Sequence, residues 1–185
     1  MRNLRIIALG FVLAASLTGC GGTSTATPTQ SGIPQQTIDP SLIPAAAPAD
    51  ATLVDPIIFD GGYHEYTFKV GDGPVWCTIN DQDNFVLCEQ NEATAAYDPI
   101  ATPGSCNYSY GYQFRLRQDS FSGQPFVDLP CSGGAYADPT GANKLNDHEQ
   151  IKINNLTCWV DKLTARCDNT RGNYIALGPN VWAVH

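Results

Sequence analysis

The sequence predicts an all-β domain, a small antiparallel sandwich or barrel-like sheet cross-linked by three disulfides. One observation behind this is the alternation of apolar and polar residues over 63–70 and 108–118, because successive side chains of a strand face opposite sides. A second is the six cysteines after residue 50, since an even number in an exported domain is typical of a disulfide framework. A third is the Gly, Pro, Asn and Asp found in nearly every gap between apolar runs.

The two alternating runs each carry aromatic side chains on one face. In the first, this face includes His64, so we expect this histidine to lie in the core or at its edge. In the second, it includes Tyr108, Tyr110 and Tyr112, which predicts one long strand with a row of tyrosines. Shorter strands are predicted at 124–130, 149–153, 173–177 and 181–184, and a single short helical turn at 91–97.

The first cysteine pair is predicted to close a hairpin. Cys77 and Cys88 lie on either side of a turn-forming stretch, residues 81–84. Folding the chain at this turn places the two cysteines opposite each other, with Ile79 opposite Val86. They then form a non-hydrogen-bonded pair, whose Cα atoms are close enough for a disulfide.

A second hairpin is predicted near the C-terminal end of the domain. A two-residue loop at 162–163 places Cys158 opposite Cys167. The same register places Trp159 opposite Arg166 on the other face, where a cation–π contact is expected. Each of the two hairpins is therefore expected to carry a disulfide.

The remaining cysteines, Cys106 and Cys131, pair by elimination. Zinc is the main alternative for these thiols, but structural zinc sites use close spacings such as C-x₂₋₄-C. Ten residues separate the cysteines of the first hairpin and eight those of the second, and no C-x-x-C occurs. We therefore expect disulfides, with no metal and no cofactor.

The pattern of residues 1–19 predicts a lipoprotein signal peptide. Arg2 and Arg5 precede a short apolar run that is too short to span a bilayer. The run ends in Leu-Thr-Gly-Cys20, which resembles the bacterial lipobox. The resemblance implies that the chain is cut before Cys20, that this residue carries a diacylglycerol and further acyl chain, and that the protein is held on the outer face of the plasma membrane. Ordinary secretion with a coincidental cysteine is the alternative.

Residues 20–50 predict a disordered tether between the lipid and the domain. The stretch is rich in Pro, Thr and Ala, holds five of the chain's thirteen prolines and has no aromatic residue, so it cannot bury enough apolar area to fold. Residues 51–185 then form one disulfide-stabilised domain, a length suited to a single core.

The charge of the chain argues against two classes of partner, nucleic acid and anionic lipid headgroups. The formal net charge is −8, with 18 acidic against 10 basic residues and no Lys/Arg cluster. Such a chain does not attract nucleic acid or anionic lipid headgroups. The expected contact with the membrane is therefore through the lipid anchor.

The aromatic residues supply the candidate binding surface. Trp76 and Trp159 are expected on the outer faces of their hairpins, each with one side exposed. With Arg166 and Tyr110 they could stack against a sugar ring or an apolar ligand. The alternative is that these side chains simply form the core face of a sheet.

The sequence contains no complete catalytic arrangement. His148 stands between Asp147 and Glu149, but consecutive residues cannot all face one metal ion or one substrate. No serine has a recognisable base partner, and His185 is the terminal residue. An envelope hydrolase would rest on His148 and its neighbouring carboxylates alone.

Three stretches carry a resemblance to a known family. "GPVWCTI", "FVLCEQ" and the closing segment 145–177 resemble a family of small six-cysteine exported actinobacterial proteins whose domain has no known function. The resemblance covers about residues 66–184 and implies a scaffold and a location, but brings no catalytic residues. The closing positions that match are Cys167, Asn169, Gly172, Tyr174 and Leu177. The chain departs from the family at 73–75, at Asn173, where His is usual, and at 177–179.

Together these features predict a cell-envelope lipoprotein that is a non-catalytic binding or structural module. Its partner would be an envelope protein or glycan. The alternatives are an envelope hydrolase and a carrier of an apolar ligand inside the sheet.

Overall fold

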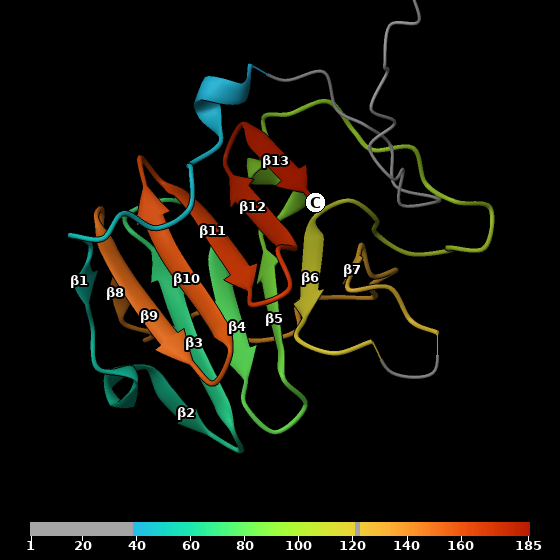
Figure 1. The fold of residues 1–185 in the computed structure, drawn as a ribbon. Coiled ribbons are helices and arrows are strands. Elements are labelled where there is room, and N and C mark those ends of the chain that lie inside the picture. The colour runs from blue at the N-terminus through green and yellow to red at the C-terminus, as the bar shows by residue number, and fades with distance from the viewer. Residues whose placement is uncertain (1–38, 121–122) are drawn as a thin grey trace, which may run out of the picture.

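In a computed structural model, which describes residues 39–120 and 123–185, the chain forms a β-sandwich (Figure 1). The predicted all-β class is confirmed. One sheet, here called the C-terminal sheet, has the order β1-β9-β10-β11-β12-β13. Its strands are β1 (Thr52–Leu53), β9 (Glu149–Ile153), β10 (Leu156–Asp161), β11 (Thr164–Asn169), β12 (Tyr174–Gly178) and β13 (Val181–Val184).

The other sheet, here called the N-terminal sheet, has the order β2-β3-β4-β5-β6-β7, with β8 paired to β3. Its strands are β2 (Asp60–Gly62), β3 (Glu65–Val70), β4 (Trp76–Asn80), β5 (Phe85–Glu89), β6 (Gln113–Arg117), β7 (Val127–Asp128) and β8 (Lys144–Leu145). The pairs are antiparallel except β1 with β9 and β8 with β3. Three short 3₁₀ helices complete the described elements: η1 (Pro40–Leu42), η2 (Pro56–Phe59) and η3 (Glu92–Thr94).

The core lies between the two sheets, which face each other in Figure 1 with the orange and red strands in front of the green ones. Phe68, Ile79 and Phe114 of the N-terminal sheet are fully buried. Ile175 and Leu177 of the C-terminal sheet are also fully buried. This inward-facing half of each alternating strand supplies the apolar area that stabilises the fold.

Both predicted hairpins are confirmed in register. Cys77 lies opposite Cys88 in β4 and β5, and Cys158 lies opposite Cys167 in β10 and β11. Both pairs form disulfides, and so do Cys106 and Cys131. The first two bridges meet across the core, since Sγ of Cys88 and Sγ of Cys167 are 3.8 Å apart.

Several of the shorter predicted elements are also found. The strands expected at 149–153, 173–177 and 181–184 correspond to β9, β12 and β13. The helical turn expected within 91–97 is η3. The strand expected at 124–130 shortens to the two residues of β7.

The predicted long strand over 108–118 is wrong in its first half, because β6 begins only at Gln113. Gly111 has a φ of +87°, and a Cβ built on it would lie 2.8 Å from the Cβ of Ile100. Only glycine fits this left-handed position beside the Ile100 side chain. The chain therefore turns at residue 111, and the three tyrosines do not share one strand face.

The prediction that His64 lies on the apolar face of a strand is also wrong. Its φ is +65°, which places it in the turn between β2 and β3. Its side chain is 60% exposed and its Nδ1 lies 2.8 Å from Oδ1 of Asp81. The alternation in β3 therefore begins after His64, with Phe68 and Val70 in the core.

The end of the segment predicted as a tether, residues 39–50, lies against the C-terminal sheet. The carbonyl oxygen of Ala45 accepts from Nε1 of Trp159 at 3.0 Å, and that of Pro44 accepts from Nη1 of Arg166 at 2.9 Å. Pro44 is buried. The folded part thus includes residues before 51. The predicted signal peptide and the predicted lipidation site Cys20 lie outside the described residues.

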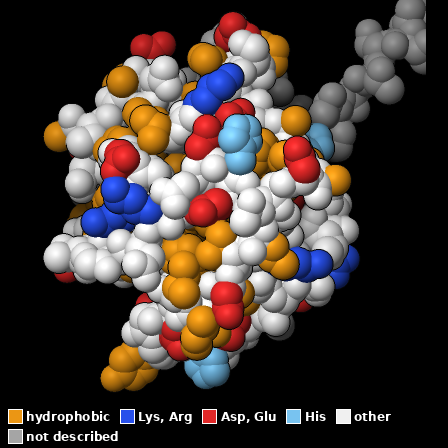
Figure 2. All heavy atoms as spheres, turned by 90° about the vertical axis from the view of Figure 1, so that its left-hand side faces the viewer, with side chains coloured by type: hydrophobic (Ala, Val, Ile, Leu, Met, Phe, Trp, Pro, Cys, Tyr) orange, Lys and Arg blue, Asp and Glu red, His pale blue; other side chains and the backbone are white. Residues whose placement is uncertain are grey.

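Within residues 39–120 and 123–185, no helix has the length and apolar character needed to cross a membrane. The edge formed by β1 and η2 carries exposed apolar side chains, and Figure 2 shows such side chains near the middle of this face. Leu53, Ile57 and Ile58 are 63%, 64% and 47% exposed.

Candidate functional site

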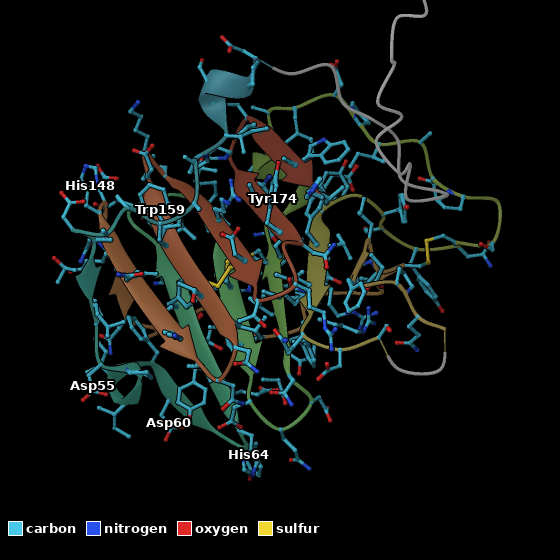
Figure 3. The ribbon with its side chains drawn as sticks, in the orientation of Figure 1. Asp55, Asp60, His64, His148, Trp159 and Tyr174 are labelled. Carbon is cyan, nitrogen blue, oxygen red and sulfur yellow. A yellow bond between two sulfur atoms is a disulfide. The ribbon has the colours of Figure 1, made fainter. Side chains whose placement is uncertain are left out.

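The structure does not bring the four predicted binding residues together. Trp76 and Tyr110 belong to the side of the N-terminal sheet, and Trp159 and Arg166 to the outer face of the C-terminal sheet. Trp76 and Trp159 are each only 5% exposed, so the expectation that one side of each ring is open is wrong. The segment containing Ala45 covers Trp159, which Figure 3 labels on the front sheet.

Arg166 pairs with other residues than expected. Its guanidinium lies 3.9 Å from the ring centroid of Tyr174 instead of stacking on Trp159. It also donates to both carboxylate oxygens of Asp168, with the shortest bond at 2.7 Å. Tyr174 in turn stacks on His185, with ring centroids 5.5 Å apart. Arg166 is therefore already paired with Asp168 and Tyr174 on the surface of the sheet.

Tyr110 is half-buried at the margin of the core. It lies in the loop before β6 and packs against the buried apolar cluster. Burial raises the pKa of its hydroxyl, and the charge of Asp128 adds to the rise.

The residues on which the hydrolase alternative depends, His148 and its neighbouring carboxylates, do not converge on a common site. The side chain of His148 is 71% exposed and lies 3.7 Å from the carboxylate of Asp147. The Asp147 carboxylate accepts instead from the backbone N–H of Lys162, and that of Glu149 from the N–H of Asn146. His64, the other histidine with an acidic partner, lies at the opposite end of the sandwich (Figure 3). Among the described residues, neither histidine is hydrogen-bonded to a serine, threonine or cysteine side chain.

A concave site that the sequence analysis missed lies where β5 ends and β6 begins. It is a pocket of about 110 Å³ whose lining contains two carboxylates and no Lys, Arg or His. The lining residues are Trp76, Glu89, Gln90, Asn91, Glu92, Ser109, Tyr112, Gln113, Pro130, Ser132, Gly134 and Ala135. We call it the acidic pocket.

Glu89 forms the floor of the acidic pocket and is only 1% exposed. Its Oε1 accepts from Nε1 of Trp76 at 2.8 Å and from the N–H of Ala137 at 3.1 Å. Its Oε2 accepts from Nε2 of Gln113 at 2.7 Å and from the N–H of Tyr136 at 2.9 Å. N–H groups only donate, so this donor set suits a carboxylate. The network fixes the loop around residue 136 onto the outer face of the N-terminal sheet.

The Cys106–Cys131 disulfide holds one wall of the pocket. It joins the loop before β6 to the loop after β7, and the backbone N–H of Ser132 donates to the carbonyl of Ser109 at 3.0 Å beside it. Pro130, Ser132 and Gly134 follow on that second loop and line the pocket. A covalent link between two loops keeps this wall in place without a ligand.

The opposite wall is formed by η3 and Tyr112. Burial raises the pKa of Tyr112, and the negative charge of Glu92 raises it further. The Tyr112 ring stacks on Tyr97 at 6.3 Å between centroids. Tyr97 donates its hydroxyl to the carbonyl of Gly111 at 2.8 Å, and burial raises its pKa to about 12. This wall of the pocket is therefore a packed aromatic pair beside η3.

Gln90 is the one lining residue with an unused buried hydrogen-bonding atom. It is 4% exposed, and its Nε2 donates to the carbonyl of Gly178 at 3.3 Å. Its Oε1 is buried and has no partner within the described structure, a state shared there only with Nε1 of Trp182. Leaving such an atom unpaired costs about 1–3 kcal/mol.

The donor set of the pocket does not favour a metal ion. Both oxygens of Glu89 are already occupied by N–H groups. In the described parts of the chain, the metal-ligand atoms that converge within 4.8 Å belong to Cys77, Cys88 and Cys167. All three are in disulfides and so offer no thiolate.

No protein-family model, curated protein or solved structure matches this chain. The role of the acidic pocket is therefore inferred from its geometry and chemistry alone.

Proposed function

We propose that the protein is a lipid-anchored, non-catalytic module on the outer face of the bacterial plasma membrane, and that its acidic pocket binds a positively charged group of an envelope protein or glycan. The observation that carries the proposal is the construction of this pocket. Its lining carries the negative charges of two carboxylates, Glu89 and Glu92, with no basic side chain to neutralise them.

The rigidity of the pocket supports a binding role. Four N–H donors hold Glu89, and a disulfide joins the loops of one wall. A site whose groups are ordered before the ligand arrives loses less conformational entropy on binding. The net charge of −8 adds a field that attracts cations over a longer range.

The size of the pocket restricts what enters it. Sites for whole small molecules usually have volumes of about 300–1,000 Å³, whereas this one has about 110 Å³. It suits the end of a side chain or substituent whose remaining part stays outside. A side chain or substituent of a neighbouring cell-envelope component meets this condition, because only its end has to enter the pocket.

The two alternatives from the sequence find less support. A hydrolase needs a nucleophile or an activated water beside a base, and His148 projects into solvent away from the acidic pocket. A carrier of an apolar ligand needs an apolar cavity, and the space between the sheets is filled by side chains such as Phe114, Leu116 and Leu177, each fully buried.

Photo-crosslinking in cells tests the proposal. A photoreactive phenylalanine replaces Ala135, an exposed residue of the pocket lining, in the full-length chain; Thr140, exposed and outside the lining, is the matched control position. We expect a membrane-bound protein with an adduct of discrete mass at position 135 and none at 140. The adduct should disappear in a Glu92→Gln background and persist with Asp98→Asn, which removes one exposed charge outside the pocket. Equal adducts in both backgrounds, or none at 135, would contradict the proposal.

The anchor is tested on the same samples. Intact-mass measurement of the membrane fraction should show a chain that begins at Cys20 with its lipid. Protein found only in the medium, with an unmodified Cys20, would contradict this part.

A further inference from the structure

We propose that the edge formed by β1 and η2, residues 52–59, is a docking site for an extended segment of another protein whose apolar side chains are flanked by basic residues. This β1–η2 edge shares no residue with the acidic pocket, so it is a second site beyond the proposed function. Three features lead to it: an open strand edge, a group of exposed apolar side chains and a rim of carboxylates.

The strand edge is open because β1 is the outermost strand of the C-terminal sheet in the described residues. On its inner side, the N–H groups of Thr52 and Val54 donate to the carbonyls of His148 and Gln150 at 3.0 and 2.8 Å. Backbone groups of successive strand residues point to opposite edges, so the N–H and C=O of Leu53 point outward. A partner strand can therefore join the sheet by pairing with Leu53.

The apolar side chains at this edge give a joining strand something to pack against. Leu53, Ile57 and Ile58 are 63%, 64% and 47% exposed, and Figure 2 shows apolar side chains gathered on this face. Val54 packs against the core, so the alternation of the strand turns Leu53 to the outer side. Single exposed apolar residues are common, whereas a group of them is typical of an interaction site.

A shallow depression continues the surface beyond η2. It has a volume of about 520 Å³ and is lined by Ile58, Ala142, Asn143, Lys144 and Asn146. Ile58 belongs both to the exposed apolar group and to this lining. A segment that pairs with β1 and continues past η2 therefore finds a hollow for one of its following side chains.

The charges around the β1–η2 edge favour a basic partner. Asp55 and Asp60 flank η2 as its N-cap and C-cap, and both are exposed (Figure 3). Asp50, also exposed, precedes β1. Lys144 in the adjoining depression is already paired with Asp72. Basic residues on either side of an apolar stretch would complement these carboxylates.

The same charges disfavour two other occupants. In a symmetric contact with a second copy, the carboxylates of Asp55 and Asp60 would approach their own counterparts, and like charges repel. An anionic membrane surface is disfavoured as well, because the chain has a net charge of −8. A basic-flanked extended segment fits the open edge, the apolar group and the carboxylate rim together.

The test uses three peptides with blocked ends and the full-length protein in nanodiscs of phosphatidylcholine. The first peptide is Lys-Val-Thr-Val-Thr-Val-Lys. The second has glutamate in place of both lysines, and the third has proline in place of the central valine. Calorimetry measures affinity: we expect the first peptide to bind saturably, the second about tenfold more weakly because its charges are repelled, and the third about fivefold more weakly because proline lacks an N–H.

Hydrogen exchange followed by NMR reports where the peptide binds. The N–H groups of Thr52 and Val54 are already hydrogen-bonded to neighbouring carbonyls, whereas that of Leu53 faces outward. The first peptide should therefore slow exchange at Leu53 and leave the exchange of its two neighbours unchanged. Exchange that slows nowhere along β1 would contradict docking at this edge.

Variants test the apolar and charged groups separately. Leu53→Ser and Ile57→Ser should each lower affinity for the first peptide about tenfold, whereas Leu42→Ser, which removes a side chain 45% exposed on η1, should leave it unchanged. Asp55→Asn keeps the acceptor that caps the N–H of Ile57 but removes the charge, so it should reduce the preference for basic over acidic flanks about threefold. Glu92→Gln, in the acidic pocket, should not affect the peptide.

Four results would overturn this inference. They are equal affinity for basic and acidic flanks, unchanged affinity in Leu53→Ser and Ile57→Ser, slowed exchange at Leu53 that increases with protein concentration alone, and slowed exchange there on transfer to anionic nanodiscs. The third would show that a second copy occupies the edge, and the fourth that a membrane does. None of them affects the adduct at position 135, so the inference can fail while the proposed function of the acidic pocket stands, and the reverse.

Discussion

Replacing Glu89 by Gln is the most direct perturbation of the acidic pocket, because it changes a single atom of a buried carboxylate. Four N–H donors contact Glu89: those of Trp76 and Ala137 bond Oε1, that of Gln113 bonds Oε2, and that of Tyr136 lies 2.9 Å from Oε2 and 3.2 Å from Oε1. The glutamine amide retains one oxygen and presents an NH₂ group in place of the other. If the NH₂ group replaces Oε2, the amide of Gln113 loses its bond while the N–H of Tyr136 retains Oε1; the other orientation removes the acceptor of Trp76 and Ala137.

The magnitude follows from the loss of at least one such bond. A hydrogen bond to a charged partner contributes about 1.5–3 kcal/mol, so Glu89→Gln should lower the free energy of unfolding by at least about 1.5–3 kcal/mol. The total stability of a domain is about 5–15 kcal/mol. The variant should therefore fold, but with a lower denaturation midpoint.

Denaturant unfolding followed by circular dichroism measures the change in the free energy of unfolding, and hydrogen exchange locates the part of the chain that is destabilised. The amides of Tyr136 and Ala137, which donate to Glu89, should lose protection first. The matched control is Glu65→Gln, which alters a partly exposed carboxylate that accepts from the Tyr136 hydroxyl at 2.5 Å. This control should cost less than about 1 kcal/mol, in the range of exposed polar contacts. A cost below about 1 kcal/mol for Glu89→Gln, with both amides still protected, would refute the assigned role of Glu89.

Three further predictions address other parts of the molecule. Replacing Cys106 and Cys131 together by Ala opens a loop with a sequence separation of 25 and should lower the free energy of unfolding by about 3.5 kcal/mol; an unchanged midpoint in denaturant would contradict this. Trp159→Phe removes the hydrogen bond to Ala45, which contributes about 1 kcal/mol. Limited proteolysis should therefore cut residues 43–51 faster in this variant than in the control Trp182→Phe. Equal cleavage rates in the two variants would contradict the contact between Trp159 and Ala45. Burial raises the pKa of Tyr97 to about 12, above the value of about 10 in an unfolded chain. The folded state therefore retains the hydroxyl proton at higher pH than the unfolded chain does. The contribution of Tyr97 to the free energy of unfolding is complete below about pH 10 and is lost as the pH rises to about 12. Tyr97→Phe should flatten that decline in denaturant unfolding, and parallel slopes for the two proteins would exclude Tyr97 as its source.

The parts predicted correctly from the sequence are those set by neighbours along the chain. The turn between β10 and β11 has two residues, so the pairing of Cys158 with Cys167 follows from the chain's own connectivity. The turn at 81–84 likewise places Cys77 opposite Cys88. Alternation with a period of two also identifies which strand residues face the core, as with Phe68 and Val70.

The parts that were missed or wrong depend on a local backbone exception or on a distant segment. Gly111 interrupts an otherwise regular alternation, because its left-handed φ beside Ile100 ends the extended chain there. His64 continues an apolar pattern in the sequence but occupies a turn with a positive φ. A periodic pattern carries no information about either exception.

By itself the sequence determined the all-β class and the registers of the two cysteine hairpins, because these follow from side-chain periodicity and short turns. The third disulfide, Cys106–Cys131, followed by elimination. Only the tertiary structure decided which polar residues are buried and what covers the tryptophans. Trp159 is covered by Ala45, 114 residues away, and the Glu89 carboxylate is met by the N–H of Tyr136, 47 residues away. Glu89 in the sequence is one of 18 acidic residues. It becomes the floor of a pocket because a distant loop folds over it, and contacts between segments so far apart in the chain form only when the two sheets pack and their loops close.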